Sequence, residues 1–172
     1  SRVWIIDVID GSKEFSTGRS DWSVHVALVV DGRPALASVG LPDAGRVFRT
    51  DQVHYVDGPP SGNMVISRNN PPAGIGEVAG ALGLKTRPMG SAGAKMLSVL
   101  LGDADVYLHA GGQYEWDQAA PVGVALASGL HASRLDGTPI RFNKSDTYSP
   151  DILVCRPDMT EQVLAAAAAM QP

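Results

Sequence analysis

The residues best suited to chemistry are two aspartates, three positions apart, at the end of an apolar run. Residues 3–6 lead directly into Asp7 and Asp10, and Gly11 and Ser12 follow. An apolar run that stops at acids and glycine predicts a strand whose end carries these side chains into a cleft. Carboxylates held this close repel each other unless a cation lies between them, and their oxygens suit Mg²⁺ or Mn²⁺. With the free N–H groups of Gly11 and Ser12, the segment predicts a place where metal and phosphate meet.

A simpler interpretation exists for each acid in the candidate site. Asp7 and Asp10 could cap a turn, because aspartate accepts local backbone hydrogen bonds and tolerates turn geometry. Asp117 could be the N-cap of a helix, where an acid is also favoured by the helix dipole. The residue types alone leave both interpretations open.

Three ordered blocks of sequence resemble a known family. Residues 7–12 (DVIDGS) resemble the D-P-[IL]-D-G-[TS] signature of the lithium-sensitive, magnesium-dependent phosphatases of the inositol monophosphatase superfamily. Residues 115–120 (EWDQAA), with Gly129 beyond them, resemble its second signature, W-D-x-x-A before an apolar helix and a glycine. Residues 90–95 and 102–107 resemble the connecting region of its phosphoadenosine-phosphatase branch, the CysQ group. The likeness spans nearly the whole chain.

The resemblance implies a metal centre. Asp7 would bridge two ions, Asp10 and Asp117 would bind the second, and the carbonyl of Ile9 would complete the first. Ser12 keeps the hydroxyl that would hydrogen-bond the nucleophilic water, so the implied catalytic set is Asp7, Asp10, Ser12 and Asp117. The implied cofactor is Mg²⁺, as two or three ions, with Mn²⁺ as a substitute and Li⁺ as an inhibitor. Val8 replaces the family's usual proline, which removes a residue that rigidifies the loop.

The resemblance also implies a substrate pocket, formed by Gly11, Ser12, Ser67, Arg68, Gly90, Ser91, Ala92, Lys95 and His109. The glycine-rich segment 90–93 precedes an expected helix, so its N–H groups are predicted to face an anion, and Lys95 adds charge. A solvated side chain is the alternative for Arg68. His109 stands where phosphoadenosine phosphatases tend to have arginine, and it either contacts substrate or caps a strand. We interpret His25, on a strand face, and Cys155 as structural.

Composition limits the class of protein. With 172 residues, 44% hydrophobic and 19% charged, the chain fits a globular protein of one sizeable domain or two small ones. A net charge of −4 without a basic run argues against a nucleic-acid polymer as partner. One cysteine, Cys155, cannot form an internal disulfide. Without an apolar run of membrane-spanning length or a signal peptide, we predict a cytoplasmic protein that does not bind membranes.

The pattern of residues predicts an α/β protein in two parts. Residues 1–58 form an antiparallel sheet half with the first metal motif, and residues 59–172 form an α/β half with the second motif and the substrate loop. The expected strands are 3–6, 22–30, 35–39, 47–50, 64–67, 106–109 and 152–155. The expected helices are 75–82, 95–101, 118–128 and 160–170, with Pro121 in the first turn of the third. Residues 14–21 are predicted to be a polar loop and residues 56–63 a linker.

The resemblance implies the layered α-β-α-β-α sandwich of the sugar phosphatases, here without its first helical layer. In the family, that layer precedes the first signature and supplies a Glu-Glu pair that binds metal and holds the attacking water. The expectation is either a fragment of a longer protein or a shortened homologue, with Glu14 as a partial replacement for the glutamate.

The resulting hypothesis is a metal-dependent phosphomonoesterase, of the 3'(2'),5'-bisphosphate nucleotidase or inositol-phosphatase type. Its small substrate would be a 3'-phosphoadenosine nucleotide, an inositol phosphate or a sugar phosphate, in that order. The alternative is a catalytically impaired phosphatase-like subunit or binding module, which needs a partner chain or the missing N-terminal segment. An uncovered apolar layer also predicts a homodimer or a complementing chain.

Overall fold

The first half of the chain forms an antiparallel sheet. The computed structural model describes residues 1–52, 55 and 57–170. Four strands lie in sequence order across this sheet: β1 (Arg2–Asp10), β2 (Ser23–Val30), β3 (Arg33–Leu41) and β4 (Arg46–Arg49). A short helix, α1 (Ser12–Ser16), follows β1, and a 3₁₀ turn, Pro42–Ala44, precedes β4. The β-branched residues of β1 and β2 favour this pleated arrangement.

The second half forms a mixed sheet in the order β6-β5-β7-β9-β8. Its strands are β5 (Asn63–Ser67), β6 (Lys85–Met89), β7 (Val106–Tyr114), β8 (His131–Ser133) and β9 (Tyr148–Cys155). β5 is parallel to β6 and β7, whereas β9 is antiparallel to β7 and β8. The helices are α2 (Ile75–Ala81), α3 (Ala92–Leu100), α4 (Glu115–Ala127) and α5 (Thr160–Ala167), and 3₁₀ turns cover Pro157–Met159 and Ala168–Met170.

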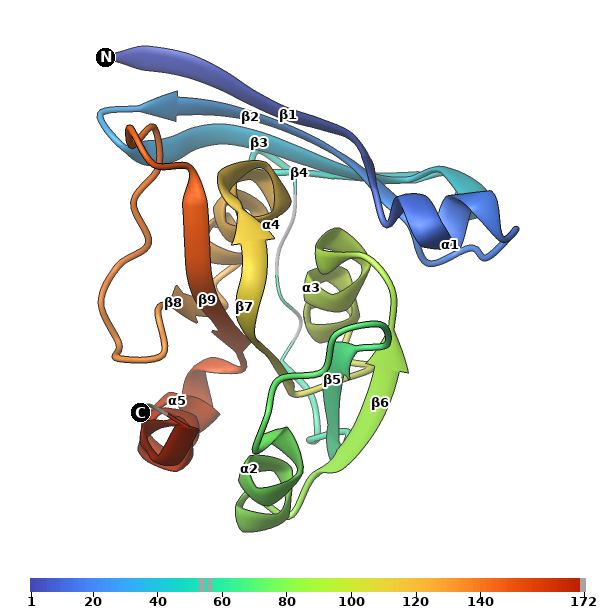
Figure 1. The fold of residues 1–172 in the computed structure, drawn as a ribbon, viewed down its shortest axis with the longest axis vertical. Helices are drawn as coiled ribbons and strands as arrows, with labels where there is room; N and C mark the ends of the chain where they lie inside the picture. Colours follow the sequence, from blue (N-terminus) through green and yellow to red (C-terminus); the bar gives the residue numbers. More distant parts are fainter. Residues whose placement is uncertain (53–54, 56, 171–172) are drawn as a thin grey trace.

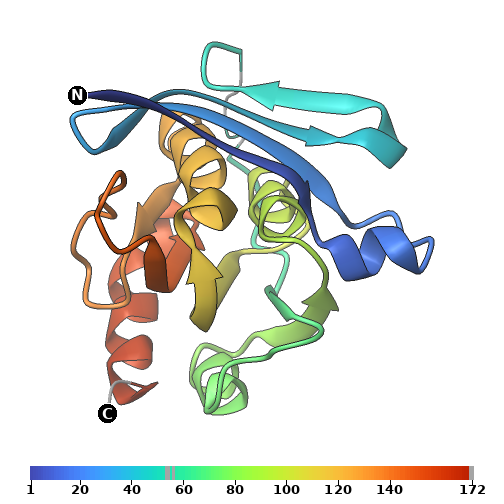
Figure 2. The same ribbon diagram turned by 45° about the horizontal axis from the view of Figure 1, so that its top comes forward.

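Sheets and helices alternate in layers. Figures 1 and 2 show α3 and α4 between the two sheets, with α2 and α5 on the far face of the mixed sheet. The main core lies around α3 and α4 and contains side chains from both sheets, and a second core lies under α2 and α5. The order is therefore sheet, helices, sheet, helices. Over residues 1–52, 55 and 57–170, this order agrees with the predicted layered α/β fold that lacks the first helical layer.

Small residues allow α4 to lie close to the first sheet. A Cβ built on Gly123 would lie 2.8 Å from the Cβ of Ala37 and 3.0 Å from that of Pro34 on β3. A larger residue would push the helix away from the sheet, because protein interiors are close-packed. The position of α4 matters for the site, because this helix carries Asp117.

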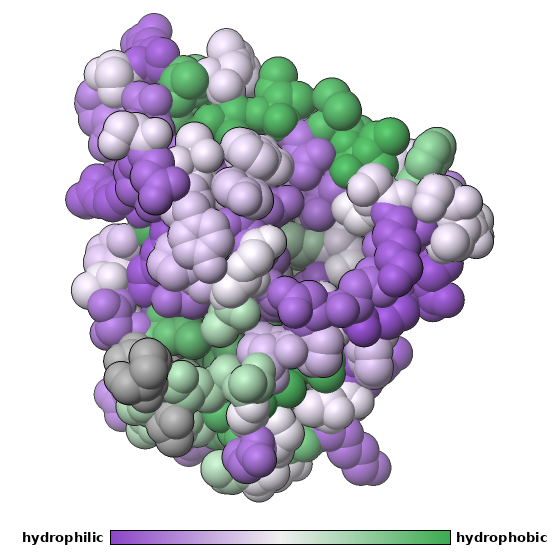
Figure 3. Space-filling model, viewed as in Figure 1, coloured by the Kyte–Doolittle hydropathy of each residue, from purple (hydrophilic) through white to green (hydrophobic). Residues whose placement is uncertain are grey.

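The outer face of the four-stranded sheet is apolar and exposed. Trp4 is 59% exposed, Val8 72% and Val47 63%. Figure 3 shows this hydrophobic surface along the edge where β1 lies. Strand side chains alternate between faces, so the inward side chains of β2, Ser23, His25, Ala27 and Val29, are buried. Among the described residues, no helix has the length and apolarity needed to cross a membrane.

Several predicted elements need correction. Helix α1 occupies part of the segment predicted as a polar loop over 14–21. Helix α4 begins at Glu115, so Pro121 lies inside the helix and not in its first turn. β6 and β8 were not predicted. β6 is an edge strand with charged residues and Pro88, and it lacks the alternating pattern that identifies a half-buried strand.

Other predictions agree with the structure or stay untested. Gly129, just past α4, has φ 90°, as expected for a glycine that ends a helix. Cys155, the last residue of β9, is buried in the protein core, as predicted. The division into domains 1–58 and 59–172 stays a prediction, and Val56 of the proposed linker lies outside the described residues.

Candidate metal centre

A bulge at the end of β1 places two aspartates on one side of the sheet. Asp7 pairs with His25 and Asp10 with Ser23, so three steps along β1 match two along β2. In a regular strand, residues 7 and 10 would point to opposite faces. The extra residue of the bulge reverses that alternation, a common device beside active sites. Both carboxylates therefore reach the inner side of the sheet.

A second bulge precedes the third aspartate. Ala110 of β7 pairs with Asp151, but Gln113 pairs with Ser149, and the intervening Gly111 and Gly112 have φ values of 85° and 73°. β7 then continues directly into α4. Asp117 is the third residue of that helix, and its Oδ2 accepts the backbone N–H of Tyr114 at 2.7 Å. It therefore supports the helix start but is not the N-cap, which is Tyr114.

The three aspartates converge. Asp7, Asp10 and Asp117 each offer a carboxylate oxygen within 4.8 Å of the others. Each carboxylate uses one oxygen within the protein: Asp7 Oδ1 accepts from Ile9 N at 3.1 Å, Asp10 Oδ2 from Gly93 N at 3.1 Å, and Asp117 Oδ2 from Tyr114 N. Among the described residues, the second oxygen of each has no hydrogen-bond donor. Each of the three anchored carboxylates thus keeps one oxygen that an added ligand could use.

The electrostatics of the cluster fit a divalent cation. Burial, and then the neighbouring Asp10 and Asp7, raise the pKa of Asp117 to about 7. Burial and Asp10 also raise the pKa of Asp7. A bound cation favours the ionised carboxylates and offsets both effects. All-oxygen donors are the ligands of Mg²⁺ and Mn²⁺, so the donor set fits the implied metal.

Lys95 is a buried cation close to these acids. The side chain is 2% exposed, and its Nζ donates to the carbonyl of Gly90 and lies 5.3 Å from the ring centroid of Tyr107. Burial lowers the pKa of Lys95 to about 8, while Asp10, Glu14 and Asp21 act in the opposite direction. Its charge therefore faces the acidic groups, although it lies within the protein and not on an open loop.

The predicted anion loop is mostly occupied by internal hydrogen bonds. The N–H groups of Gly90, Ser91 and Gly93 donate to Asp21 Oδ2, Asp21 O and Asp10 Oδ2 at 2.8, 2.9 and 3.1 Å. The Ser91 hydroxyl caps α3 by accepting the N–H of Ala94 at 3.0 Å. The prediction that these N–H groups face an anion is therefore wrong for Gly90, Ser91 and Gly93. Their assignment to substrate binding, with Ala92, stays a prediction.

Arg68 is paired and not solvated. Its guanidinium contacts Glu14 Oε1 at 3.0 Å and also Asp21 Oδ2, so the solvated alternative is wrong. Glu14 Oε1 also accepts from Asn69 at 2.8 Å. Glu14 is therefore engaged by Arg68 and Asn69, and it is not among the three clustered carboxylates. The neighbouring Ser67 accepts the N–H of Asn70 at 3.1 Å.

The remaining predicted residues are not among the three clustered carboxylates. Gly11, in the left-handed region with φ 85°, leads into α1, of which Ser12 is the first residue. A Cβ on Gly11 would lie 3.1 Å from that of Ser91, so the motif and the loop touch. His109 on β7 is 3% exposed, and its Nδ1 has no partner among the described residues. Burial, and then Lys95, lower the pKa of His109 to about 4.

Sequence reasoning missed two residues that touch the cluster. Ser23 and His25 on β2 are both fully buried, and both contact Asp10 Oδ2 at 3.3 Å. The signal was present, because Ser23 and His25 alternate with apolar residues on the inward face of a strand. It pointed only to burial, since pairing with the acids depends on the register of β1 against β2.

The fold and the acidic cluster together define a layered α/β protein with a candidate metal centre. The chain belongs to the inositol monophosphatase family, whose model matches residues 1–171. It is 48% identical to a 3'-phosphoadenosine 5'-phosphate phosphatase of Mycobacterium tuberculosis, over 97% of this chain and 67% of that protein. It is 30% identical to the 3'(2'),5'-bisphosphate nucleotidase CysQ of Escherichia coli K12, over 86% and 65%. The chain thus spans about two thirds of the length of these relatives.

Solved structures support the fold. An inositol monophosphatase from Zymomonas mobilis matches with a TM-score of 0.80 and 21% identity, over 97% of this chain and 70% of that one. One from Anabaena matches with a TM-score of 0.78 and 21% identity, over 99% and 73%. At this identity the solved structures show the fold alone. The family match and the named relatives identify a metal-dependent phosphomonoesterase.

Proposed function

We propose that the protein hydrolyses a phosphomonoester of a small metabolite. The favoured substrate is a 3'-phosphoadenosine nucleotide, followed by an inositol phosphate and a sugar phosphate. The observation that carries this proposal is the convergence of Asp7, Asp10 and Asp117. In the described part of the chain, each has one anchored oxygen and one oxygen without a donor. The order of substrates is supported by the names of the relatives at 48% and 30% identity.

The three aspartates and the carbonyl of Ile9 would hold the metal, Mg²⁺ or Mn²⁺, as two or three ions. When bound, such ions activate water as a nucleophile and neutralise charge on the leaving oxygen. Ser12 would orient the attacking water through its hydroxyl, and the first N–H groups of α1 at Gly11 and Ser12 would hold the phosphate. Helix starts carry N–H groups without intrahelical partners, which suits an anion.

The remaining pocket residues would act on the rest of the substrate. Lys95 would offset negative charge from within, because it lies buried beside the acids. Ser67, Arg68 and His109 would line the pocket, together with the loop from Gly90 to Ala92. Since Arg68 already pairs with Glu14 and Asp21, substrate contact by its guanidinium would compete with that ion pair.

A second candidate function is a catalytically impaired phosphatase-like subunit. Among the described residues, no fourth carboxylate joins the cluster, and Glu14 is held by Arg68 and Asn69. Such a protein would need a partner chain or an N-terminal segment to supply the water-holding acid. The exposed apolar face around Trp4, Val8 and Val47 supports a homodimer or a complementing chain.

A phosphate-release assay on the purified protein separates these functions. The three substrate types are each tested with Mg²⁺, with EDTA and with Mg²⁺ plus Li⁺. We expect release in Mg²⁺ that is greatest for the 3'-phosphoadenosine nucleotide, abolished by EDTA and inhibited by Li⁺. Release that persists in EDTA would contradict the metal-dependent mechanism. Mg²⁺-dependent binding of the nucleotide without release would favour the impaired subunit.

A further inference from the structure

A buried histidine connects the two segments that carry the acids. His25 on β2 is fully buried. Its Nδ1 lies 3.1 Å from the carbonyl oxygen of Trp116, the residue before Asp117. Its Nε2 lies 3.3 Å from Asp10 Oδ2 and 2.8 Å from the Ser23 hydroxyl. One imidazole therefore reaches the end of β1 through one nitrogen and the first turn of α4 through the other.

The contact with Trp116 has a fixed direction. A backbone carbonyl can only accept a hydrogen bond, so Nδ1 of His25 is the donor. The other nitrogen belongs to a network around Asp10 Oδ2, in which the Ser23 hydroxyl lies 3.3 Å from that oxygen and 2.8 Å from Ser91 Oγ. The same Asp10 oxygen accepts the N–H of Gly93. The anchored oxygen of Asp10 is thus held from β2 and from α3 together.

Helix α3 packs tightly against the imidazole of His25. A Cβ built on Gly93 of α3 would overlap both Nε2 of His25 and the Ser23 hydroxyl. Glycine at this position lets α3 press directly against the pair. His25 is therefore enclosed by its own strand, by α3 and by the start of α4. A fully buried side chain with partners on several elements couples the positions of those partners.

We infer that His25 is a positioning residue that sets the distance between Asp10 and Asp117, and thereby the affinity of the cluster for a divalent cation. The inference rests on the proposed metal site. Outer groups that orient metal ligands typically contribute a factor of roughly 10 to 100 in metal affinity. The pairing of β1 with β2 also holds these residues side by side, because His25 lies opposite Asp7 and Ser23 lies opposite Asp10.

Two substitutions each remove one arm of the bridge. His25→Asn keeps an amide donor near the position of Nδ1 but loses the arm to Asp10. His25→Gln keeps a polar group near the position of Nε2 but loses the arm to Trp116. Because a bridge needs both arms, we expect each variant to raise the Kd for Mn²⁺ by roughly 10- to 100-fold. The measurement is titration calorimetry of the purified protein with Mn²⁺ alone.

Ser23→Ala gives an independent test with a smaller change in shape. It removes one hydroxyl contact of Asp10 and leaves the His25 bridge to Trp116 in place. We expect a rise in the Kd for Mn²⁺ of a few-fold, below that of the His25 variants. If neither His25 variant folds, this result alone decides the inference, and an unchanged Kd overturns it.

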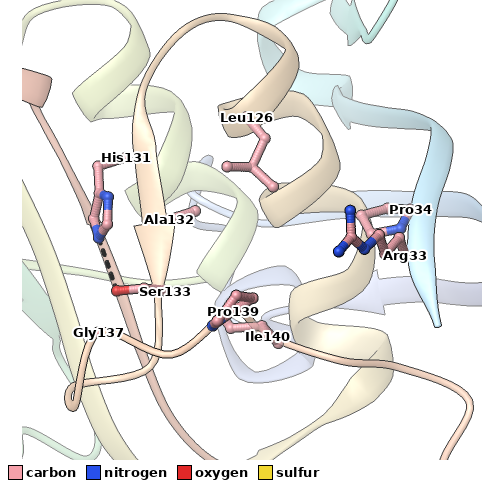
Figure 4. Close-up of a pocket in the computed structure, with 9 residues that line it drawn as sticks. All are labelled: Arg33, Pro34, Leu126, His131, Ala132, Ser133, Gly137, Pro139 and Ile140. Atoms are coloured by element: carbon pink, nitrogen blue, oxygen red, sulfur yellow. Dashed lines mark hydrogen bonds between the residues drawn. The ribbon is translucent and has the colours of Figure 1, made fainter.

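The second sheet provides a matched control. Nε2 of His131 on β8 lies 2.8 Å from the hydroxyl of Ser133, two residues away (Figure 4). The same distance and the same separation along the chain are found between His25 and Ser23. His131 lines a pocket of about 350 Å³ with Leu126, near the end of α4 opposite Asp117. We expect His131→Asn and His131→Gln to leave the Kd for Mn²⁺ unchanged, whatever their effect on thermal stability in EDTA.

The outcomes separate this inference from the proposed function. Folded His25 variants that bind Mn²⁺ as tightly as the wild type overturn the positioning role and leave the metal site standing. Equal weakening in the His131 variants also overturns it, because the effect would then follow general stability. A wild-type protein that takes up no Mn²⁺ contradicts the metal site itself, and the inference falls with it.

Discussion

The acid cluster and the loop from Gly90 to Lys95 are neighbours with opposite hydrogen-bonding states. In the cluster, each carboxylate keeps one oxygen without a donor among the described residues. In the loop, the N–H groups of Gly90, Ser91 and Gly93, the hydroxyl of Ser91 and the ammonium of Lys95 all have partners within the protein. Both segments were predicted to bind ligand groups.

This difference in hydrogen bonding indicates which polar groups are available to a ligand. A carboxylate oxygen that is shielded from water and has no donor is costly, and Asp10 is buried while Asp7 and Asp117 are half-buried. Three such carboxylates in one place indicate a site that a cation completes. A loop whose donors are already used does not gain by binding an anion unless those bonds break. The N–H groups of Gly93 and Gly90 therefore support the neighbouring acids, since they donate to Asp10 and Asp21, and substrate contact by the loop stays a proposal for its other groups.

Substitution in the cluster should have the largest effect on activity. Asp10→Asn replaces an oxygen ligand with an amide while keeping the shape of the side chain. We expect Mg²⁺-dependent phosphate release to fall at least about 100-fold, since even outer groups of metal sites contribute roughly 10- to 100-fold. The fold, followed by circular dichroism, should stay intact. The control is Asp43→Asn, whose carboxylate accepts from Trp22 Nε1 at 3.2 Å and is not one of the three clustered acids. Unchanged activity in Asp10→Asn would refute the site.

Substitution in the loop should act mainly on stability. A Cβ on Gly90 would lie 2.5 Å from the backbone oxygen of Asp21, so Gly90→Ala forces the loop and the β1–β2 connection apart. We expect the free energy of unfolding to fall by about 1–3 kcal/mol in urea titrations. Gly80→Ala on α2 is the matched control, because nothing lies within 4 Å there, and it should be neutral or stabilising by about 0.5–1 kcal/mol. Lost activity at unchanged stability in Gly90→Ala would show a direct role in substrate binding.

The smallest predicted effect is a change in thermal stability whose sign depends on whether metal is bound to the cluster. Asp117→Asn removes a carboxylate whose pKa is raised to about 7 by burial and by Asp10. Since the folded protein prefers the protonated acid, this group costs the wild type stability as pH rises from about 4 through 7. In EDTA at pH 7.5 we therefore expect a higher Tm for the variant, by about 2–4 °C for each kcal/mol relieved. The gain should shrink toward pH 4, and Mg²⁺ should reverse its sign. A lower Tm in EDTA would contradict the electrostatic account.

Prediction from sequence succeeded where a local pattern fixes the outcome. The strand predicted over 3–6 lies within β1, and the helix predicted over 118–128 overlaps α4. These elements and the glycine at 129 follow from apolar runs, turn residues and helix caps. Prediction from sequence was incomplete where contacts with residues distant in the chain determine the structure. β6 forms because β5 offers it a parallel edge, and its own residues lack a strand pattern. The solvated alternative for Arg68 stayed open because its partners, Glu14 and Asp21, lie 54 and 47 positions away.

By itself, the sequence determined the family signatures, the α/β class and the three aspartates, because these follow from residue types at fixed spacing. Which carboxylate oxygens of the three aspartates lack a donor among the described residues depends on the tertiary structure. Two bulges, each of one extra residue, turn Asp10 inward and set the start of α4, and a register between β1 and β2 brings His25 beside the acids. Strand register and the packing of α3 against β2 are long-range properties, and no spacing within one segment encodes them.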